Sequence, residues 1–337
     1  MMASSTSATL STVLQHAAFA PVTDRAFLRV TGSDATRWLN GMVTNSVAAL
    51  KPGEGNYNFL LNAQGRIQGD CLLFREPSPA EPPTYLLVTE GAQLEAIQAH
   101  LDCFIIMDDV ELTPAYAEEA GLLLLGPEAA AHLPALHLPV LHLPVPDPLQ
   151  LVLADTPHGA VLLFTPPATS VPRFELRAPA ATLQVLAAEL VAASVPEVTS
   201  GTLEQLRIYE GTPRFGTDIR NSETARELPQ ETNQTHALHF SKGCYLGQEI
   251  VERIHSRGQV HRIFTAFELE GSLPTLPATL QANGKSIGEL TSATPVELDG
   301  TTPLLALGYC RREALESRTT LTYPGGTALP RTLPKPS

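Results

Sequence analysis

The sequence predicts an α+β protein that ends in a small all-β module. Strand, helix and hairpin patterns occur in two successive groups before residue 200, which indicates two related α+β halves. After Gly258 the helical patterns give way to short strands separated by turns at Asn283-Gly284 and Asp299-Gly300. Such a run of short strands is typical of a small β-barrel.

Apolar periodicity and turn residues predict the individual elements. The expected strands lie at residues 27–30, 56–61, 67–74, 84–89, 104–112, 122–125, within 151–164, and at 174–176, 264–270, 288–292, 304–311 and 321–323. One expected helix ends at Leu39, and three others span residues 91–101, 180–193 and 203–209. A further helix is expected to start near Leu246. We expect Asn62-Ala63-Gln64-Gly65 to form the turn of a hairpin.

Composition and charge narrow the functional classes. The chain has 337 residues, of which 43% are hydrophobic and 17% charged, a balance typical of a globular protein rather than a disordered one. A formal net charge of −13 argues against a general nucleic-acid binder. Between Ser200 and Arg262, however, eight Lys and Arg balance eight Asp and Glu, so this segment could accept an anionic ligand.

From the N-terminal stretch and the spacing of the cysteines we expect a cytoplasmic protein that holds no resident metal. No Lys or Arg precedes Arg25, so a basic targeting region is absent from this stretch, and we expect it to be a frayed lead-in. No apolar run approaches the ~18 residues of a membrane span. The four cysteines form no C-x-x-C pair, which argues against a zinc ribbon or a local set of cluster ligands. His132, His137 and His142 repeat in a Pro-rich stretch, and their spacing of five argues against convergence on a metal.

The stretch around Cys244 carries the most distinctive chemistry of the sequence. Gly243 and Gly247 bracket Cys244, and apolar residues recur at helical spacing after Gly247. We therefore expect a tight loop that feeds a helix, with Cys244 just before the helix and beside Lys242. A nearby cation and a helix N-terminus both favour the thiolate, so Cys244 is a candidate reactive group. The alternative is a glycine-rich turn with a small buried cysteine.

Two carboxylates outside that stretch are also candidates. Asp70 lies within an apolar strand, where it is either turned to solvent or held for a purpose. Glu231 lies in a long polar passage without periodicity, which is typical of an ordered loop that lines a site.

The octapeptide Lys242-Gly243-Cys244-Tyr245-Leu246-Gly247-Gln248-Glu249 resembles the motif of the YgfZ family. It is preceded by Leu228-Pro229-Gln230-Glu231-Thr232-Asn233 and followed by Arg253 and Gly258, as in that family. Supporting matches occur at Gly65-Arg66-Ile67-Gln68-Gly69-Asp70 and at the strand 306–309, and the resemblance runs from about residue 27 to residue 323. YgfZ proteins are bacterial folate-binding proteins with mitochondrial relatives in iron–sulfur cluster maturation. They belong to the superfamily of the glycine cleavage T-protein, an aminomethyltransferase.

The resemblance implies a ring around a central channel that holds tetrahydrofolate or a derivative. Two interleaved subdomains would span residues 20–262, with the motif-bearing segment at 200–262, and a barrel would span 263–330. Glu231 is the first candidate to bind the pterin amino group and ring N–H, with Glu210 and Asp70 as reserves. The ring would stack on Tyr245, and the glutamate tail would meet Arg253 or Arg214. The alternatives are that Glu231 caps a loop, that Tyr245 is core and that the arginines form surface pairs.

Two departures from the T-protein pattern argue against aminomethyl transfer. The paired acidic residues of that pattern are matched by Gly69-Asp70, which leaves one carboxylate. The Leu-Glu-Ala-Gly motif is matched by Ile208-Tyr209-Glu210-Gly211, which moves the carboxylate by one place. Either of these two changes in the acidic residues could remove the proton transfer that the reaction needs. T-proteins also lack the cysteine of the Lys-Gly-Cys-Tyr motif.

The sequence thus favours an accessory factor over an enzyme. The leading hypothesis is a tetrahydrofolate-binding protein that supports iron–sulfur cluster assembly or repair, and through it client enzymes such as those that modify tRNA, without contacting nucleic acid or membrane. One cysteine cannot hold a cluster alone, so Cys244 would need a partner. The alternatives are a folate-dependent one-carbon transferase of the T-protein type and a folate-binding scaffold without chemistry.

Overall fold

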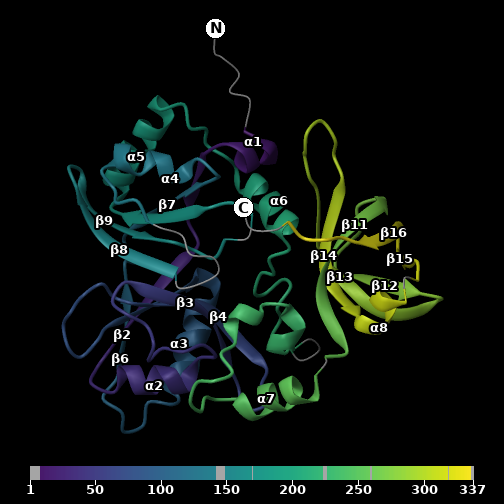
Figure 1. The fold of residues 1–337 in the computed structure, drawn as a ribbon, viewed down its shortest axis with the longest axis horizontal. Coiled ribbons are helices and arrows are strands. Elements are labelled where there is room, and N and C mark those ends of the chain that lie inside the picture. The colour runs from purple at the N-terminus through teal and green to yellow at the C-terminus, as the bar shows by residue number, and fades with distance from the viewer. Residues whose placement is uncertain are drawn as a thin grey trace.

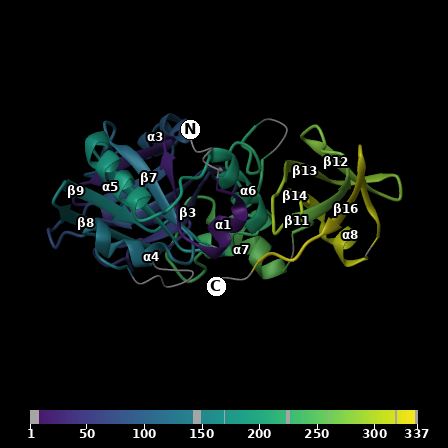
Figure 2. The ribbon, with the colours of Figure 1, turned by 90° about the horizontal axis from the view of Figure 1, so that it is seen from above.

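A sheet that is shared by two α+β halves forms one end of the molecule, and a closed barrel forms the other (Figure 1). The structure is a computed structural model that describes residues 8–141, 149–168, 170–222, 226–258, 260–317 and 319–334. His142 of the histidine repeat lies outside these ranges. Figure 2 shows the barrel set apart from the sheet, with α1, α6 and α7 between them.

The strands of the large sheet follow the order β1-β7-β10-β9-β8-β3-β4-β5-β2-β6 over the residues that the structure describes. Their bounds are β1 Ala18–Val22, β2 Arg25–Thr31, β3 Glu54–Leu61, β4 Ile67–Arg75, β5 Tyr85–Glu90, β6 Glu111–Ala115, β7 Ala120–Leu125, β8 Leu149–Thr156, β9 Gly159–Phe164 and β10 Arg173–Ala178. The barrel runs β11-β14-β13-β12-β15-β16. Its bounds are β11 Arg262–Gly271, β12 Ala278–Ala282, β13 Lys285–Pro295, β14 Leu304–Arg311, β15 Leu321–Tyr323 and β16 Gly326–Pro330.

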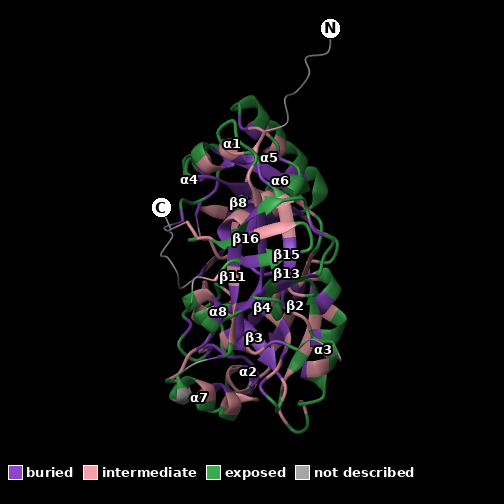
Figure 3. Cartoon of the chain, turned by 90° about the vertical axis from the view of Figure 1, so that its right-hand side faces the viewer, coloured by how far each residue is buried: buried purple, intermediate pink, exposed green. Residues whose placement is uncertain are grey.

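Helices cover the sheet and connect the halves, with their exposed faces outward and the strands buried (Figure 3). The α-helices are α1 Leu10–Gln15, α2 Ala35–Met42, α3 Leu94–Asp102, α4 Ala129–His132, α5 Ala180–Ala192, α6 Ser200–Glu210, α7 Gln248–Arg257 and α8 Arg312–Glu316. The 3-10 turns are η1 Gly91–Gln93, η2 Pro134–Leu136, η3 Pro229–Thr232 and η4 Thr235–Ala237. None of these described helices is long and apolar enough to cross a membrane.

The two halves are interleaved because the chain's first strand belongs to the second half. β1 pairs with β7, in the register Ala18↔Leu125, and thereby extends the sheet formed by β7 to β10. The halves join at a short antiparallel contact between β3 and β8, Glu54↔Gln150 and Gly55↔Leu149. The expected α+β class, with interleaved halves and a C-terminal barrel, is confirmed.

The start of the chain differs from the expected frayed lead-in. Leu10 and Val13 of α1 and Phe19 of β1 are buried, and β1 is fully paired with β7. The lead-in is rich in Ala, Ser and Thr, so its few apolar anchors gave too weak a pattern to be recognised.

A second difference concerns the segment after α3. Residues 104–112 were expected to form a strand, but β6 begins only at Glu111 and residues 103–110 form a loop. The apolar run from Phe104 to Met107 suggested a buried strand, yet three of its four side chains are exposed. Periodicity cannot separate a short buried strand from an exposed apolar loop.

Buried carboxylates attach the barrel to the rest of the chain. Asp218 is fully buried and accepts hydrogen bonds from Arg207 Nη1 at 2.7 Å, Ser292 Oγ at 2.8 Å and the backbone N–H of Arg214 at 2.9 Å. Ser292 lies on β13 of the barrel, whereas Arg207 lies on α6. One carboxylate therefore joins the barrel to the helix that precedes it, in a setting where a lost partner leaves a buried charge.

We predict that Asp218→Ala lowers the free energy of unfolding by about 3–5 kcal/mol, because Arg207 and the Arg214 amide lose a buried acceptor. Urea-induced unfolding followed by circular dichroism measures the change. Glu268→Ala, which removes an exposed carboxylate on β11, is the matched control and should change the value by about 0.5 kcal/mol or less. A loss below ~1 kcal/mol for Asp218→Ala would contradict this view of the barrel attachment.

Candidate functional site

A cavity of about 260 Å³ lies where the large sheet meets α6 and the loop that follows it. Its charged side chains come from separate elements. They include Arg25 on β2, Asp70 on β4, Glu90 at the end of β5, Glu210 at the end of α6 and Arg214. We call this space the central cavity.

Asp70 is held inside the central cavity by two neutral donors. Tyr57 donates its hydroxyl to Asp70 Oδ2 at 2.6 Å, and Gln93 donates Nε2–H to Oδ1 at 2.8 Å. Burial raises the pKa of Asp70, although both hydrogen bonds and the Arg25 charge oppose this effect. Burial and the Asp70 charge raise the pKa of Tyr57 well above its usual value, so the phenol stays a donor. Asp70 is therefore partly buried and hydrogen-bonded rather than turned to solvent. Within the described parts of the chain each of its oxygens accepts one side-chain hydrogen bond and has a further lone pair.

Glu90 lines the same cavity and was missed by the sequence analysis. Burial raises its pKa, and the nearby Asp70 charge adds to this effect. The charges of Arg25 and Arg214 oppose this effect, and Arg214 Nε lies 3.8 Å from Glu90 Oε1. The only signal in the sequence was a carboxylate that ends the apolar strand β5, a common arrangement at a surface.

Glu210 and Arg214, both expected in the site, do line the central cavity. Glu210 is buried, and Arg173 Nη2 donates to both of its oxygens at 2.6 Å. Ser170 adds its backbone N–H at 2.9 Å and its hydroxyl at 2.6 Å. The carboxylate of Glu210 is thus satisfied by the protein itself. Arg214 pairs with Glu204 at 2.8 Å and remains partly exposed.

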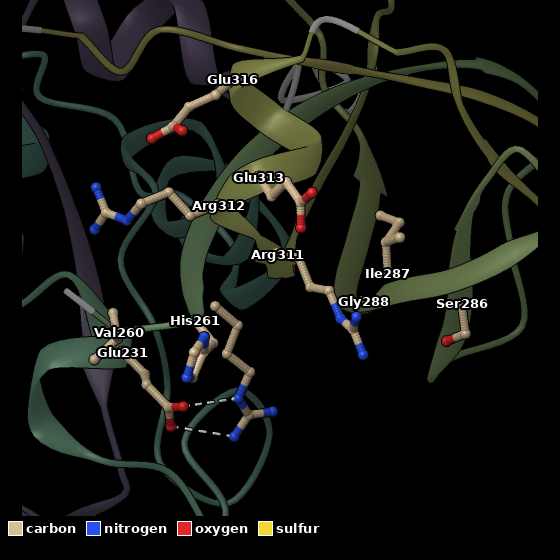
Figure 4. Close-up of a pocket in the computed structure, with 11 residues that line it drawn as sticks. Glu231, Val260, His261, Ser286, Ile287, Gly288, Arg311, Arg312, Glu313 and Glu316 are labelled. Carbon is tan, nitrogen blue, oxygen red and sulfur yellow. Dashed lines mark hydrogen bonds and ion pairs between the residues drawn. The ribbon is translucent and has the colours of Figure 1, made fainter.

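Glu231, by contrast, faces a different cavity (Figure 4). Arg262 donates Nε–H to its Oε1 at 3.1 Å and Nη2–H to its Oε2 at 3.2 Å, and the Leu228 backbone N–H donates to Oε2 at 2.9 Å. This second cavity, of about 710 Å³, lies between η3, the start of β13 and α8. Glu231 therefore caps η3 and ties it to β11, which is the structural alternative considered for it.

Tyr245 and Arg253 also lie away from the central cavity. Tyr245 is buried against Phe59, Ile67 and Val251, and burial raises the pKa of its phenol. Arg253 is exposed on α7. The structure thus brings together Asp70, Glu210 and Arg214 and separates them from the other three expected ligand residues. The reason is that sequence proximity to the octapeptide does not determine which side of the β3–β4 hairpin a residue reaches.

Gly247 of the octapeptide and Gly65 of the β3–β4 hairpin allow these two segments of backbone to approach each other closely. Gly247 has φ +81°, and a Cβ there would lie 2.5 Å from the carbonyl oxygen of Asn62 in the hairpin turn. Gly65, with φ +70°, leaves room for the side chain of Ile250 on α7. The helix begins at Gln248, close to the expected start. The octapeptide therefore locks α7 onto the β3–β4 turn.

The Lys242 side chain is partly buried and binds backbone carbonyl groups. Its ammonium donates to the carbonyl oxygens of Val43 and Asn45, both at 2.6 Å, and lies 5.0 Å from the centre of the Tyr245 ring. Burial lowers the pKa of Lys242 to about 7. Lys242 consequently serves as a clamp between residues 43–45 and the octapeptide.

The cysteines fall into two classes. Cys71 and Cys310 are buried, and burial raises the pKa of Cys71 well above its usual value and that of Cys310 to about 11. Cys244 and Cys103 are exposed. The buried-cysteine alternative for Cys244 is thus excluded, and Cys103 is accessible as well. Among the described residues, no group of three or more His, Cys, Asp or Glu could hold a metal ion.

A model of the GCVT N-terminal domain family matches residues 2–232 of the sequence. The chain belongs to this family. A solved structure of the glycine cleavage system aminomethyltransferase T from Bartonella henselae shares its fold. The TM-score is 0.81 at 23% sequence identity, with 96% of this chain and 87% of that chain covered.

Curated relatives of this GCVT-family chain carry two kinds of name. The mitochondrial iron–sulfur cluster assembly factor IBA57 of Mus musculus is 28% identical over 77% of this chain and 72% of its own length. The human protein of the same name is 26% identical over 79% of this chain and 71% of its own. An aminomethyltransferase of Alcanivorax borkumensis is 24% identical over 84% of this chain and 75% of its own.

We predict that the Lys242 side chain titrates near pH 7 in the folded protein, against ~10.4 in the unfolded chain. Between these values only the unfolded state holds the proton, so this group makes stability rise with pH over that window and not outside it. Carbon-detected NMR of labelled lysine measures the titration, and Lys242→Met should lack this part of the rise. A midpoint near 10.4 would mean that the two carbonyl groups outweigh burial.

Proposed function

We propose that this protein is a YgfZ-type member of the GCVT family that binds tetrahydrofolate in the central cavity and supports iron–sulfur cluster assembly through Cys244. The observation that carries the proposal is the pairing of carboxylates with arginines in the central cavity. The family and the names of the relatives support it. Client enzymes would include those that modify tRNA.

The chemistry of a reduced folate matches the central cavity. A pterin presents an amino group beside a ring N–H, which one carboxylate can accept in bidentate fashion. Asp70 and Glu90 both face the cavity with acceptor positions left over, whereas Glu210 is occupied by Arg173. Arg25 and Arg214 supply positive charge for the carboxylates of the glutamate tail.

The size of the cavity fits part of such a ligand. At about 260 Å³ it lies slightly below the ~300–1,000 Å³ usual for pockets that enclose a whole drug-sized ligand. The pterin would therefore occupy the cavity while the tail extends outward. Phe215 and His236, which also line it, provide ring faces for contact with the pterin.

The exposed thiol supports the cluster half of the proposal. Gly243 and Cys244 are both exposed, and a Cβ on Gly243 would meet only the amide of Asn40, at 3.9 Å. An incoming protein would thus find Cys244 accessible from outside. Because a cluster usually takes four protein ligands, Cys244 would act together with a partner that carries the others.

Aminomethyl transfer is the less favoured function. In the T-protein pattern a second carboxylate precedes Asp70, and here that place is Gly69. A Cβ on Gly69 would lie 2.8 Å from Ile97 Cγ1, so α3 fills the space that a second carboxylate would need. The chain therefore keeps one acid where that reaction uses two.

We predict that Asp70→Asn or Glu90→Gln, whichever removes the carboxylate that accepts from the pterin, weakens the binding of 5-formyltetrahydrofolate by about 10- to 100-fold. The reason is that a charge-assisted hydrogen bond to the pterin is worth ~1.5–3 kcal/mol. Isothermal titration calorimetry measures the dissociation constants. Glu231→Gln is the matched control, since its carboxylate faces the second cavity, and it should change affinity less than about twofold.

Weakened folate binding by Glu231→Gln, together with unchanged binding by Asp70→Asn and Glu90→Gln, would place the ligand in the second cavity. An absence of binding by the wild type would contradict the folate proposal altogether.

We predict that Cys244→Ser keeps folate affinity but fails to restore the activity of cluster-containing enzymes in a strain that lacks the gene. Serine preserves the size of the side chain and lacks the thiolate that binds iron. Cys103→Ser, which removes the other exposed thiol, is the control and should restore activity fully. Full rescue by Cys244→Ser would leave a passive folate-binding scaffold as the better account.

A further inference from the structure

The loop between α3 and β6 exposes apolar side chains that the fold does not use. Phe104, Ile106 and Met107 are 38%, 83% and 93% exposed, and the last two exceed every other large hydrophobic residue in the described parts of the chain. Single exposed apolar residues are ordinary, but three within four positions form a patch that soluble proteins usually reserve for a contact. We call residues 104–107 the apolar tip.

The apolar tip is held in place rather than frayed. The Trp38 indole donates to the carbonyl oxygen of Phe104 at 3.1 Å, and the Asp109 backbone N–H donates to Asp34 Oδ2 at 2.9 Å. At Gly32, with φ +115°, a Cβ would lie 2.0 Å from the Asp109 carbonyl oxygen, so the two backbones are in close contact. Ile105 turns inward onto the cluster beneath α2. These contacts hold the tip in a defined position at the surface, where it is exposed to solvent.

Acidic side chains surround the apolar tip. Asp102, Asp109 and Glu111 are exposed beside it, while Asp108 pairs with Arg37 at 2.5 Å. An anionic lipid surface would be repelled by this rim, and so would a second copy of a chain whose net charge is −13. Charge complementarity therefore favours a protein with an apolar pocket rimmed by Lys and Arg.

The apolar tip and the Cys244 loop flank the same helix. The tip contacts the middle of α2 through Trp38, and the Leu246 backbone N–H donates to the Gly41 carbonyl oxygen, near the end of α2, at 3.0 Å. Eight residues of helix span about 12 Å. Figures 1 and 3 show α2, α3 and α7 along the lower edge of the molecule, and in Figure 3 α2 lies between the other two. A partner seated on the tip would therefore come within reach of Cys244.

We propose that the apolar tip is the docking surface for a basic protein partner, which it orients toward Cys244. The orienting part rests on the proposed function, whereas the docking part does not require it. Ile106 and Met107 would enter an apolar pocket of the partner, and the acidic rim would speed association and fix its direction.

In vivo photocrosslinking tests the docking part directly. Benzoylphenylalanine is placed at position 107 of the full chain and, as the control, at position 273, where Leu273 is 56% exposed on the barrel. We expect position 107 to crosslink to one protein, identified by mass spectrometry, through a peptide whose apolar residues are flanked by Lys or Arg. No adduct beyond that at position 273, an adduct with a second copy, or an adduct with lipid would overturn the proposal.

Binding of that identified protein, once purified, provides the quantitative test. We expect Ile106→Asp and Met107→Asp to weaken binding at least about tenfold, and Glu111→Lys to weaken it most at low salt. The same measurement on Cys244→Ser separates the two proposals, because docking should persist there even if cluster assembly fails. Unchanged affinity in both tip variants would overturn the docking surface without touching the folate proposal.

Discussion

The clamp formed by Lys242 holds together segments that are nearly two hundred residues apart. Its ammonium binds the carbonyl groups of Val43 and Asn45, and the Asn45 side chain in turn donates to the carbonyl oxygen of His236 at 2.9 Å. The His236 ring lies 5.4 Å from that of Tyr57, which holds Asp70 inside the central cavity. A continuous set of contacts therefore joins the octapeptide to the cavity. The distinctive lysine of the motif supports the shape of a site that it does not line.

Among the carboxylates of the protein, one group attaches the barrel and another faces the central cavity. Fully buried carboxylates such as Asp218 attach the barrel, and their donors leave them little capacity for a ligand. Asp70 and Glu90, less fully satisfied, face the central cavity. Cys244 lies outside, on a loop that two glycine contacts fix to the β3–β4 turn. A ligand inside the cavity and a protein outside it could thus bind at the same time, which is what a folate-dependent accessory factor for clusters would need.

Local chemistry predicted the elements better than it predicted which residues meet. The Gly65 hairpin, the helix after Gly247 and the barrel follow from turn residues and periodicity, which act over a few positions. The central cavity instead depends on β5 and α6 meeting across the sheet, so the place of Glu90 at a strand end did not single it out. Glu231, near the octapeptide, faces the second cavity. Residues 104–107 were mistaken for a strand because an apolar run is the usual mark of burial. Their exposure became visible only with the neighbouring segments in place.

The most direct test of folate binding in the central cavity is a crystal structure of the protein with tetrahydrofolate. We expect electron density for the pterin inside the central cavity, with its amino group and ring N–H within about 3 Å of the Asp70 or Glu90 carboxylate. The glutamate tail should extend toward Arg214 or Arg25. Density in the second cavity beside Glu231, with the central cavity filled only by water, would contradict the account.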